Sequence, residues 1–399
     1  MPLRPDTFAL TALLAVLIGL GPMSTDMYLP SLPDIGRLLG ATTAQVQMTL
    51  SAFLAGFAVG QIFYGPISDK YGRKPVLVGA LLLYGIGTAV CAAATSIEML
   101  TAARFLQALG AGGPIVVARA MVRDLYEGRR AARELAVMGT IMSVVPALAP
   151  IAGGVLHVTF GWRSTFFAAL AFGLGSLALV LFSLPETLKQ RSPAPISPIG
   201  ILRTFGQIIA NRTFLANTAI FAAGYSGLFS FISASSFVLQ GVYGLDPVAA
   251  GAAFASCVIG FVSGSLGGTR LVMRKGEGWT IRAGVSLLAL GGLSMAAALT
   301  VGHLGPAGIL VPMAIYTCGF GLTMPQALAG AMKPFPDKAG AASSLAGFIQ
   351  MASGATTGIL VGHGLGNSAW PLAIAVNATA LIALTVFLIS GSARRSPGT

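Results

Sequence analysis

The stretch Gly60-Gln61-Ile62-Phe63-Tyr64-Gly65-Pro66-Ile67-Ser68-Asp69-Lys70-Tyr71-Gly72-Arg73-Lys74-Pro75 decides the fold, because it sets a charged turn between two long apolar segments. Pro66 and Pro75 predict the ends of the flanking helices, and Gly72 permits the backbone reversal between them. Only 9% of the residues in the whole chain are charged. We therefore expect a short polar loop that holds two neighbouring membrane helices together.

The composition excludes an ordinary soluble protein. Hydrophobic residues make up 55% of the chain and the mean hydropathy is +0.82, whereas roughly 25% of residues are charged in soluble domains. A net charge of +12 would suggest nucleic-acid binding in a soluble chain. In a membrane protein, Lys and Arg instead hold loops on the cytoplasmic side, so we expect a lipid bilayer around the chain and no nucleic-acid partner.

Twelve segments are long and apolar enough to cross a membrane, which takes roughly 20 residues each. They predict an all-α polytopic membrane protein with 12 transmembrane helices. The expected spans are residues 8–29, 47–67, 75–95, 98–122, 135–157, 163–184, 213–235, 248–270, 280–301, 305–332, 339–361 and 368–390.

The connection between the sixth and seventh spans differs from the others. Residues 186–212 are polar and contain three closely spaced prolines. We interpret them as a cytoplasmic linker between an N-terminal six-helix bundle, residues 1–185, and a C-terminal six-helix bundle, residues 213–399.

The basic residues predict the orientation of the chain. All but Arg37, Arg104 and Arg163 of the 24 Lys and Arg residues fall on one side of the expected spans, the side that also receives Arg4, Arg394 and Arg395 near the two termini. Basic loops stay in the cytoplasm. Both termini are therefore expected to be cytoplasmic.

Asp26 is the one carboxylate that falls clearly inside an expected span. Intramembrane acids are costly and usually face a water-filled cavity, where they carry function. The alternative is a helix-end carboxylate wetted by solvent, since Pro30 and Pro33 follow closely. Arg104 lies at a similar depth in the fourth span, either as the partner of Asp26 or as a brace for carbonyls at a helix break. An arginine favours a charged carboxylate and apolar surroundings favour a neutral one, so we expect Asp26 and Arg104 to couple proton movement.

The fifth span and the central cavity supply further candidates. Small residues and prolines let helices approach and bend, and the fifth span has five of them: Gly139, Pro146, Pro150, Gly153 and Gly154. Aromatic and amide side chains suit an apolar substrate cavity, although core packing explains any one of them equally well. The cavity candidates are Tyr28, Gln61, Asn217, Tyr225, Phe231, Gln326, Gln350 and Asn377.

The opening stretch resembles the G-x-x-x-D-[RK]-x-G-R-[RK] loop between helices 2 and 3 of the major facilitator superfamily. The resemblance implies two pseudo-symmetric six-helix bundles that work by alternating access, with helices 1 and 4 lining the cavity. It also implies a conformational latch at the cytoplasmic end, where the loop acid meets Asp124 and the N-terminus of the eleventh helix. The latch residues are Gly65, Asp69, Gly72, Arg73 and Asp124.

Three further stretches resemble particular groups within this superfamily. Residues Asp26-Met27-Tyr28-Leu29-Pro30-Ser31-Leu32-Pro33 and Arg123-Asp124-Leu125-Tyr126 look like the bicyclomycin and chloramphenicol resistance group of drug:proton antiporters. Arg104-x-x-Gln107 resembles the helix 4 motif of proton-coupled members of the superfamily. The end of the fifth-span set resembles an antiporter motif. This implies proton-coupled drug efflux, powered by the proton gradient without a cofactor, by a monomer in the bacterial cytoplasmic membrane.

Three other functions are alternatives to proton-coupled drug efflux. A carrier of the same superfamily dedicated to one metabolite differs in substrate range and in dependence on the proton gradient. A membrane enzyme is disfavoured because His157, His303 and His363 are isolated and no paired carboxylates, metal-ligand spacing or nucleophile motif is present. A passive channel would not need the interhelical latch.

Overall fold

Long apolar helices make up the chain, as the sequence predicts. The structure is a computed structural model that describes residues 7–126, 128–188, 190–191, 198–302, 304–366 and 368–391. Within these residues, 12 helices are long and apolar enough to cross a membrane and no strand is found, which confirms the expected class. The elements are α1 (Phe8–Asp26), η1 (Leu29–Ser31), α2 (Leu32–Leu38), α3 (Thr43–Tyr71), α4 (Arg73–Ala92), α5 (Ile97–Leu125), α6 (Gly128–Phe160), α7 (Arg163–Ser183), α8 (Pro198–Ile209), α9 (Arg212–Ser236), η2 (Phe237–Val242), α10 (Pro247–Lys275), α11 (Glu277–Val301), α12 (Ala307–Met332), η3 (Pro336–Lys338), α13 (Ala339–Gly364) and α14 (Trp370–Ile389).

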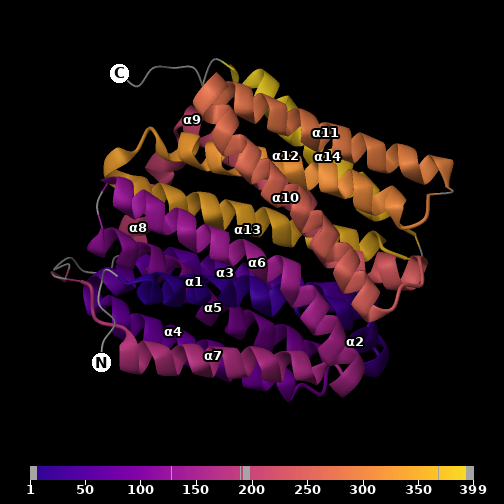
Figure 1. The fold of residues 1–399 in the computed structure, drawn as a ribbon, viewed down its shortest axis with the longest axis horizontal. Coiled ribbons are helices and arrows are strands. Elements are labelled where there is room, and N and C mark those ends of the chain that lie inside the picture. Colours follow the sequence, from indigo (N-terminus) through magenta and orange to yellow (C-terminus); the bar gives the residue numbers. More distant parts are fainter. Residues whose placement is uncertain are drawn as a thin grey trace.

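The helices form two groups that lie side by side (Figure 1). The elements α1 to α7 make one group, called here the N half, and α9 to α14 make the other, the C half. The halves meet mainly where α3 packs against α13 and where α6 packs against α10. Because each half has an even number of spans, α1 begins and α14 ends at the same end of the molecule (Figure 1).

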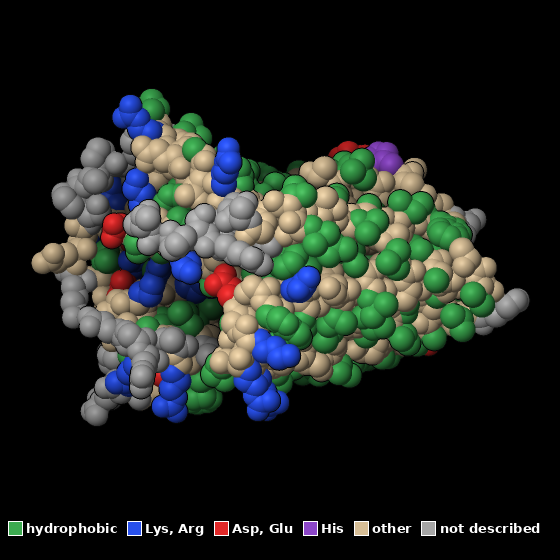
Figure 2. Space-filling model, turned by 90° about the horizontal axis from the view of Figure 1, so that it is seen from above, with side chains coloured by type: hydrophobic (Ala, Val, Ile, Leu, Met, Phe, Trp, Pro, Cys, Tyr) green, Lys and Arg blue, Asp and Glu red, His purple; other side chains and the backbone are tan. Residues whose placement is uncertain are grey.

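Basic side chains gather at that same end (Figure 2). This basic end, as we call it, carries the tight turns at Gly72 and Gly276, both with positive φ. A hollow opens there among the Lys and Arg side chains, whereas the flank toward the opposite end is largely hydrophobic (Figure 2). Burial along α3 decreases toward the basic end. Most residues from Val46 to Gly60 are buried, and most from Gln61 to Tyr71 are not.

Four local features differ from the predicted spans. The helix α3 continues through Pro66 to Tyr71, so Pro66 does not end it as expected. A proline is tolerated inside a membrane helix when neighbours satisfy the freed backbone groups. The first span continues through the short η1 and α2, and the seventh ends in a π-helical segment, η2. The predicted linker contains the helix α8.

The helix α8 belongs structurally to the C half. Ile208 of α8 is fully buried in a cluster with Phe214 of α9 and residues of α12 and α13. Lys338 adds a hydrogen bond from its Nζ to Gln207 Oε1, 2.9 Å away. Several residues named from the sequence, Arg4, Arg394, Arg395 and His303, lie outside the described residues.

Candidate functional site

Asp26 lies at the end of α1, close to the surface where the two halves meet. Its side chain is 6% exposed, and no described residue forms a hydrogen bond or an ion pair with its carboxylate. It interacts electrostatically with the phenol of Tyr225, which comes from α9 in the C half. An acid so placed can take up a proton or a cationic group without first breaking an ion pair.

Arg104 of α5 is fully buried inside the N half. Its Nη1 donates to the backbone oxygen of Ser24 at 3.0 Å and to Gln107 Oε1 at 2.7 Å. The guanidinium carbon lies 4.8 Å from the Tyr28 ring centre and 4.3 Å from the Phe53 ring centre. The arginine is therefore held by a helix-end carbonyl, an amide and two aromatic faces.

The expected ion pair between Asp26 and Arg104 is not formed among the described residues. Arg104 instead reaches the carbonyl of Ser24, in the last turn of α1, where carbonyls lack intrahelical donors. Its Nε and Nη2 atoms are buried without a hydrogen-bond partner. Depth along the two helices placed Arg104 beside the end of α1 but could not predict which atoms the guanidinium would reach. The brace that the sequence left open as an alternative is the arrangement found.

A hydrogen-bonded chain extends from Arg104 through the N half. Gln107 Nε2 donates to Thr88 Oγ1 at 2.9 Å, and Ser24 Oγ lies 2.7 Å from Tyr84 Oη. Gly110 of α5 packs so closely on α4 that a side chain there would collide with the Tyr84 backbone. These contacts fix α1, α4 and α5 around Arg104.

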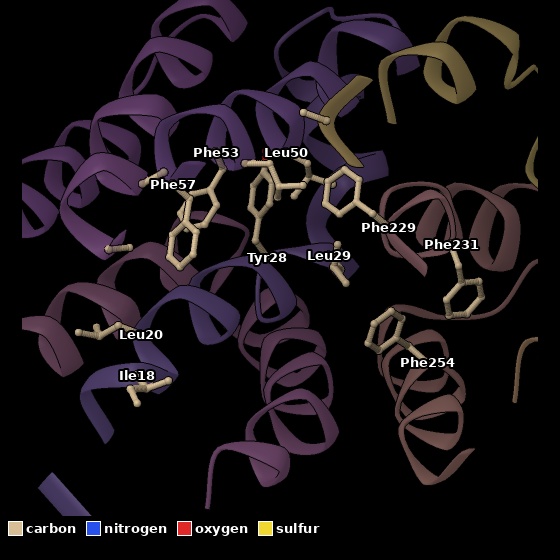
Figure 3. Packing of buried hydrophobic residues seen from close by; sticks show 14 of the residues in the cluster. Ile18, Leu20, Tyr28, Leu29, Leu50, Phe53, Phe57, Phe229, Phe231 and Phe254 are labelled. Carbon is tan, nitrogen blue, oxygen red and sulfur yellow. The ribbon is translucent and has the colours of Figure 1, made fainter. Parts of the chain in front are cut away.

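Aromatic rings line the region between Arg104 and the C half. Tyr28, Phe53 and Phe57 lie near one another in the N half, and Phe229 of the C half points toward Leu50 across the interface (Figure 3). Tyr225 stacks on Phe229 with ring centres 6.2 Å apart. Aromatic side chains from both halves thus lie at the surface where the halves meet.

The predicted cavity residues divide into two sets. Tyr225 and Gln61 lie at the α3–α13 interface, because side chains added at Gly354 and Gly347 would meet them. The buried Gln350 lies on the same stretch of α13. Three others pack inside a half: Tyr28 around Arg104, Phe231 on Phe254 with ring centres 5.5 Å apart, and Asn217 against α12.

Asn377 also lies away from the interface, since it packs against Gly292 of α11. Gln326 is partly buried on α12, and its role stays a prediction. For Phe231, Asn217 and Asn377, side-chain type alone could not distinguish a cavity wall from the packing of one bundle.

The charged cluster at the basic end forms as expected within the N half. Arg73 donates from Nε to Asp124 Oδ2 at 2.8 Å and from Nη1 to Asp69 Oδ1 at 2.5 Å and Ser68 Oγ at 2.7 Å. A second bond of 3.3 Å to Asp124 makes that pair bidentate, which is the strong geometry for arginine and carboxylate. Arg73 thereby ties the ends of α3, α4 and α5 together.

Glu186 is a member of this cluster that sequence reasoning missed, because it falls at the start of the predicted linker. Its carboxylate accepts from the backbone nitrogens of Arg73 at 3.0 Å and Lys74 at 3.1 Å. These are orphan donors at the first turn of α4, where the helix dipole also favours an anion. Gly72, with φ of 105°, leaves no room for a side chain beside Glu186. The sequence feature that could have identified Glu186 is its position as an acid directly after the sixth span.

The part of the latch that would join the halves is not engaged. The Asp69 side chain is 52% exposed, and in the described parts of the chain no hydrogen bond or ion pair joins it to the first turn of α13. Gly65 makes no close contact beyond Val116. This agrees with the hollow at the basic end (Figure 2).

The small residues of α6 hold the halves together toward the opposite end. A side chain at Gly153 would collide with the Met27 carbonyl, and one at Gly154 with Pro247 of α10. Gly251 of α10 in turn packs on the Pro150 carbonyl. Pro146 lies within the same helix, whereas Gly139 has open space around it. The motif therefore acts as a backbone contact between halves.

The chemistry available at the interface is proton exchange and apolar binding. No group of three or more His, Cys, Asp or Glu residues that could hold a metal is found in the described ranges. His157 is engaged with Asp34 at 2.9 Å.

Comparison with known proteins identifies the family of this chain. The model of the Major Facilitator Superfamily matches residues 14–358. A bicyclomycin resistance protein homolog from Haemophilus influenzae is 31% identical, with 96% of each chain covered. Multidrug resistance protein MdtL from Escherichia coli is 32% identical, with 90% of each covered.

Solved structures agree on the fold. The xylose transporter XylE from E. coli, in a partially occluded inward-open conformation, matches with a TM-score of 0.76 at 13% identity, over 98% of each chain. An inward-facing bacterial homolog of the human lysosomal transporter Spinster matches with a TM-score of 0.74 at 14% identity, over 99% of this chain and 98% of that one. The family match over most of the chain and the relatives above 30% identity lead to one conclusion: this chain belongs to the Major Facilitator Superfamily.

Proposed function

We propose that the protein exports amphipathic drugs of the chloramphenicol or bicyclomycin type in exchange for protons, by alternating access between its two halves. The observation that carries the proposal is Asp26, a buried carboxylate without an ion-pair partner among the described residues, which interacts electrostatically with Tyr225 of the other half. The relatives named for bicyclomycin and multidrug resistance support the substrate class.

In this mechanism, Asp26 carries the proton. Apolar surroundings favour the neutral form of a carboxyl group, and a drug or a water path that reaches the interface favours the ionised form. Arg104 acts as a positioning residue, since it holds the Ser24 carbonyl two residues before Asp26. The basic end faces the cytoplasm of a bacterial cell, by the positive-inside rule. The proton gradient supplies the energy, no cofactor takes part, and the working unit is a monomer.

The test is drug-induced proton release from acid-loaded inverted membrane vesicles. We expect chloramphenicol, or members of a panel of amphipathic drugs, to dissipate the gradient with the wild-type protein. Asp26→Asn keeps the size of the side chain but carries no titratable proton, so it should abolish the response while drug binding persists. Glu98→Gln is the matched control, because Glu98 is an exposed acid at the opposite end, and it should respond like wild type.

Two results would contradict the proposal. A full response from Asp26→Asn would remove Asp26 from the coupling step. Silence of the wild-type protein toward every drug would favour the second candidate, a carrier dedicated to one metabolite.

A further inference from the structure

We propose that the backbone carbonyls of Leu29 and Pro30, with the side chains of Ser236 and Gln240, form a hydrogen-bonded gate that closes the opposite end. Ser236 Oγ donates to the Leu29 oxygen at 2.6 Å, and Gln240 Nε2 donates to the Pro30 oxygen at 3.0 Å. Each bond joins a C-half side chain to the N-half backbone. The inference rests on the alternating access of the proposed function.

Pro33 changes the hydrogen bonding of one of the two acceptors, the Leu29 carbonyl. In a continuous helix, the Leu29 carbonyl would accept from the backbone nitrogen four residues later. That residue is Pro33, which has no N–H. The Leu29 oxygen accepts instead from the Leu32 N–H in the 3₁₀ turn of η1, inside a segment that is buried. A carbonyl oxygen has a second lone pair, and Ser236 of the other half donates to it.

The donors are placed by an irregular stretch of backbone. The segment η2, Phe237–Val242, is a π-helix, and the Tyr243 nitrogen bonds the Val238 oxygen five residues earlier at 3.1 Å. π-Helical turns are rare and occur mostly at functional sites. The wider turn changes which side chains face the N half, and Gln240 is the one that reaches Pro30.

The N-half side of the gate is held in place independently. Asp34 of α2, just after the gate carbonyls, accepts from His157 Nε2 of α6 at 2.9 Å. The gate bonds are hydrogen bonds between the halves in this region, so they have to break when the halves separate. Leu29 follows Asp26 by three residues, so a shift of the Asp26 segment acts directly on the gate.

The test measures how often the opposite end opens. Spin labels replace Thr95, between α4 and α5, and Leu304, between α11 and α12, in a variant without Cys91, Cys257 and Cys318. Both label sites are exposed, at the opposite end, in different halves. Distances between the labels are recorded in lipid nanodiscs, without drug or proton gradient.

We expect Ser236→Ala and Gln240→Leu each to raise the ratio of long to short distances about fivefold, the effect of one lost hydrogen bond. Ser235→Ala is the matched control, because the Ser235 hydroxyl bonds the Ile232 oxygen of its own helix at 3.3 Å. It should leave the ratio unchanged. Ser236→Thr keeps a hydroxyl at the gate and should also stay near wild type.

Distances that are the same in wild type, Ser236→Ala and Gln240→Leu would overturn the gate. An equal rise in Ser235→Ala would overturn it too, because the effect would then come from the helix rather than from the bond across the halves. Neither result depends on a drug or on proton release, so failure of the gate is distinguishable from failure of the proposed function.

Discussion

Arg104 shows how a single side chain can organise a membrane domain without a counter-ion. It is fully buried, and its contacts are a helix-end carbonyl, an amide oxygen and aromatic faces. The planar guanidinium lies against the aromatic faces while its Nη1 alone makes both hydrogen bonds, and an ammonium group has no such plane to stack. The identity of arginine, rather than its charge alone, therefore matters at this position.

Replacing Arg104 by Lys should destabilise the protein even though the charge is kept. We expect a loss of about 1.5–3 kcal/mol, the value of a hydrogen bond to a charged group, together with reduced transport because α1 and Asp26 shift. The measurement is thermal unfolding of the purified protein in detergent, with drug-induced proton release alongside. Arg37→Lys, at a side chain that is 73% exposed, is the control. A Lys variant as stable and active as wild type would show that charge alone suffices.

The sequence could predict where the important charges lie, but not all of their partners. Asp26, Arg104, Arg73 and Asp124 were all identified from their position in the spans or from a motif. The pairing of Arg104 with the Ser24 carbonyl could not be foreseen, because side-chain reach depends on the rotation of one helix relative to another. The Arg73–Asp124 pair could, because a loop residue and a helix end meet at the same membrane level.

At the scale of elements, α6 packs closely against its neighbours because its contact residues include glycines, which have no side chain. Gly153 lies against the Met27 carbonyl, and Pro150 and Gly154 face the start of α10. Such close backbone approach replaces hydrophobic burial as the source of packing where lipid surrounds the helices. The fifth span is thus part of the joint between halves at the opposite end.

A methyl group at Gly153 should loosen the packing of α6 on the segment that follows α1 within the N half. We expect Gly153→Ala to lower the unfolding temperature, because the added carbon would overlap backbone atoms that cannot rotate away. Gly139→Ala, in the same helix but in open space, should instead be neutral or stabilising by up to about 1 kcal/mol through helix propensity. Thermal unfolding of the two variants side by side is the measurement. Equal effects would mean that propensity, not contact, governs α6.

Hydropathy predicts the membrane-spanning helices but not the shorter elements. All twelve spans were predicted because each has about 20 apolar residues. The short α2, the linker helix α8 and the π-helical η2 were not predicted. A seven-residue helix has no usable periodicity, α8 lies among prolines and charges, and a π-turn depends on the partner it contacts.

At the scale of the whole molecule, the structure is closed toward the opposite end and hollowed at the basic end (Figure 2). Gate bonds and glycine contacts lie on the closed side, and the Arg73 cluster on the open side makes no bond to α13 within the described residues. The other extreme of alternating access would bring Asp69 to the first turn of α13, where the helix dipole attracts an acid.

A cross-link between these two places should therefore report closure of the basic end. Cysteines replace Lys70, next to Asp69, and Gly340 in a variant that lacks the three native cysteines. We expect a disulfide to form only when the basic end closes, and to stop transport until it is reduced. Mobility on a non-reducing gel and proton release before and after reduction are the measurements. Full transport with a complete cross-link would contradict a cycle in which the basic end has to open.

The docking of α8 has a consequence for how the polypeptide can be divided. Because Ile208 anchors α8 in the C half and Glu186 anchors the start of the linker in the N half, residues 189–197 lie between two fixed points. Two separately translated fragments, broken there, would each keep their own anchor. We expect such fragments to reassemble in one membrane into a working carrier, so that the two halves can be labelled, mutated and purified as distinct chains.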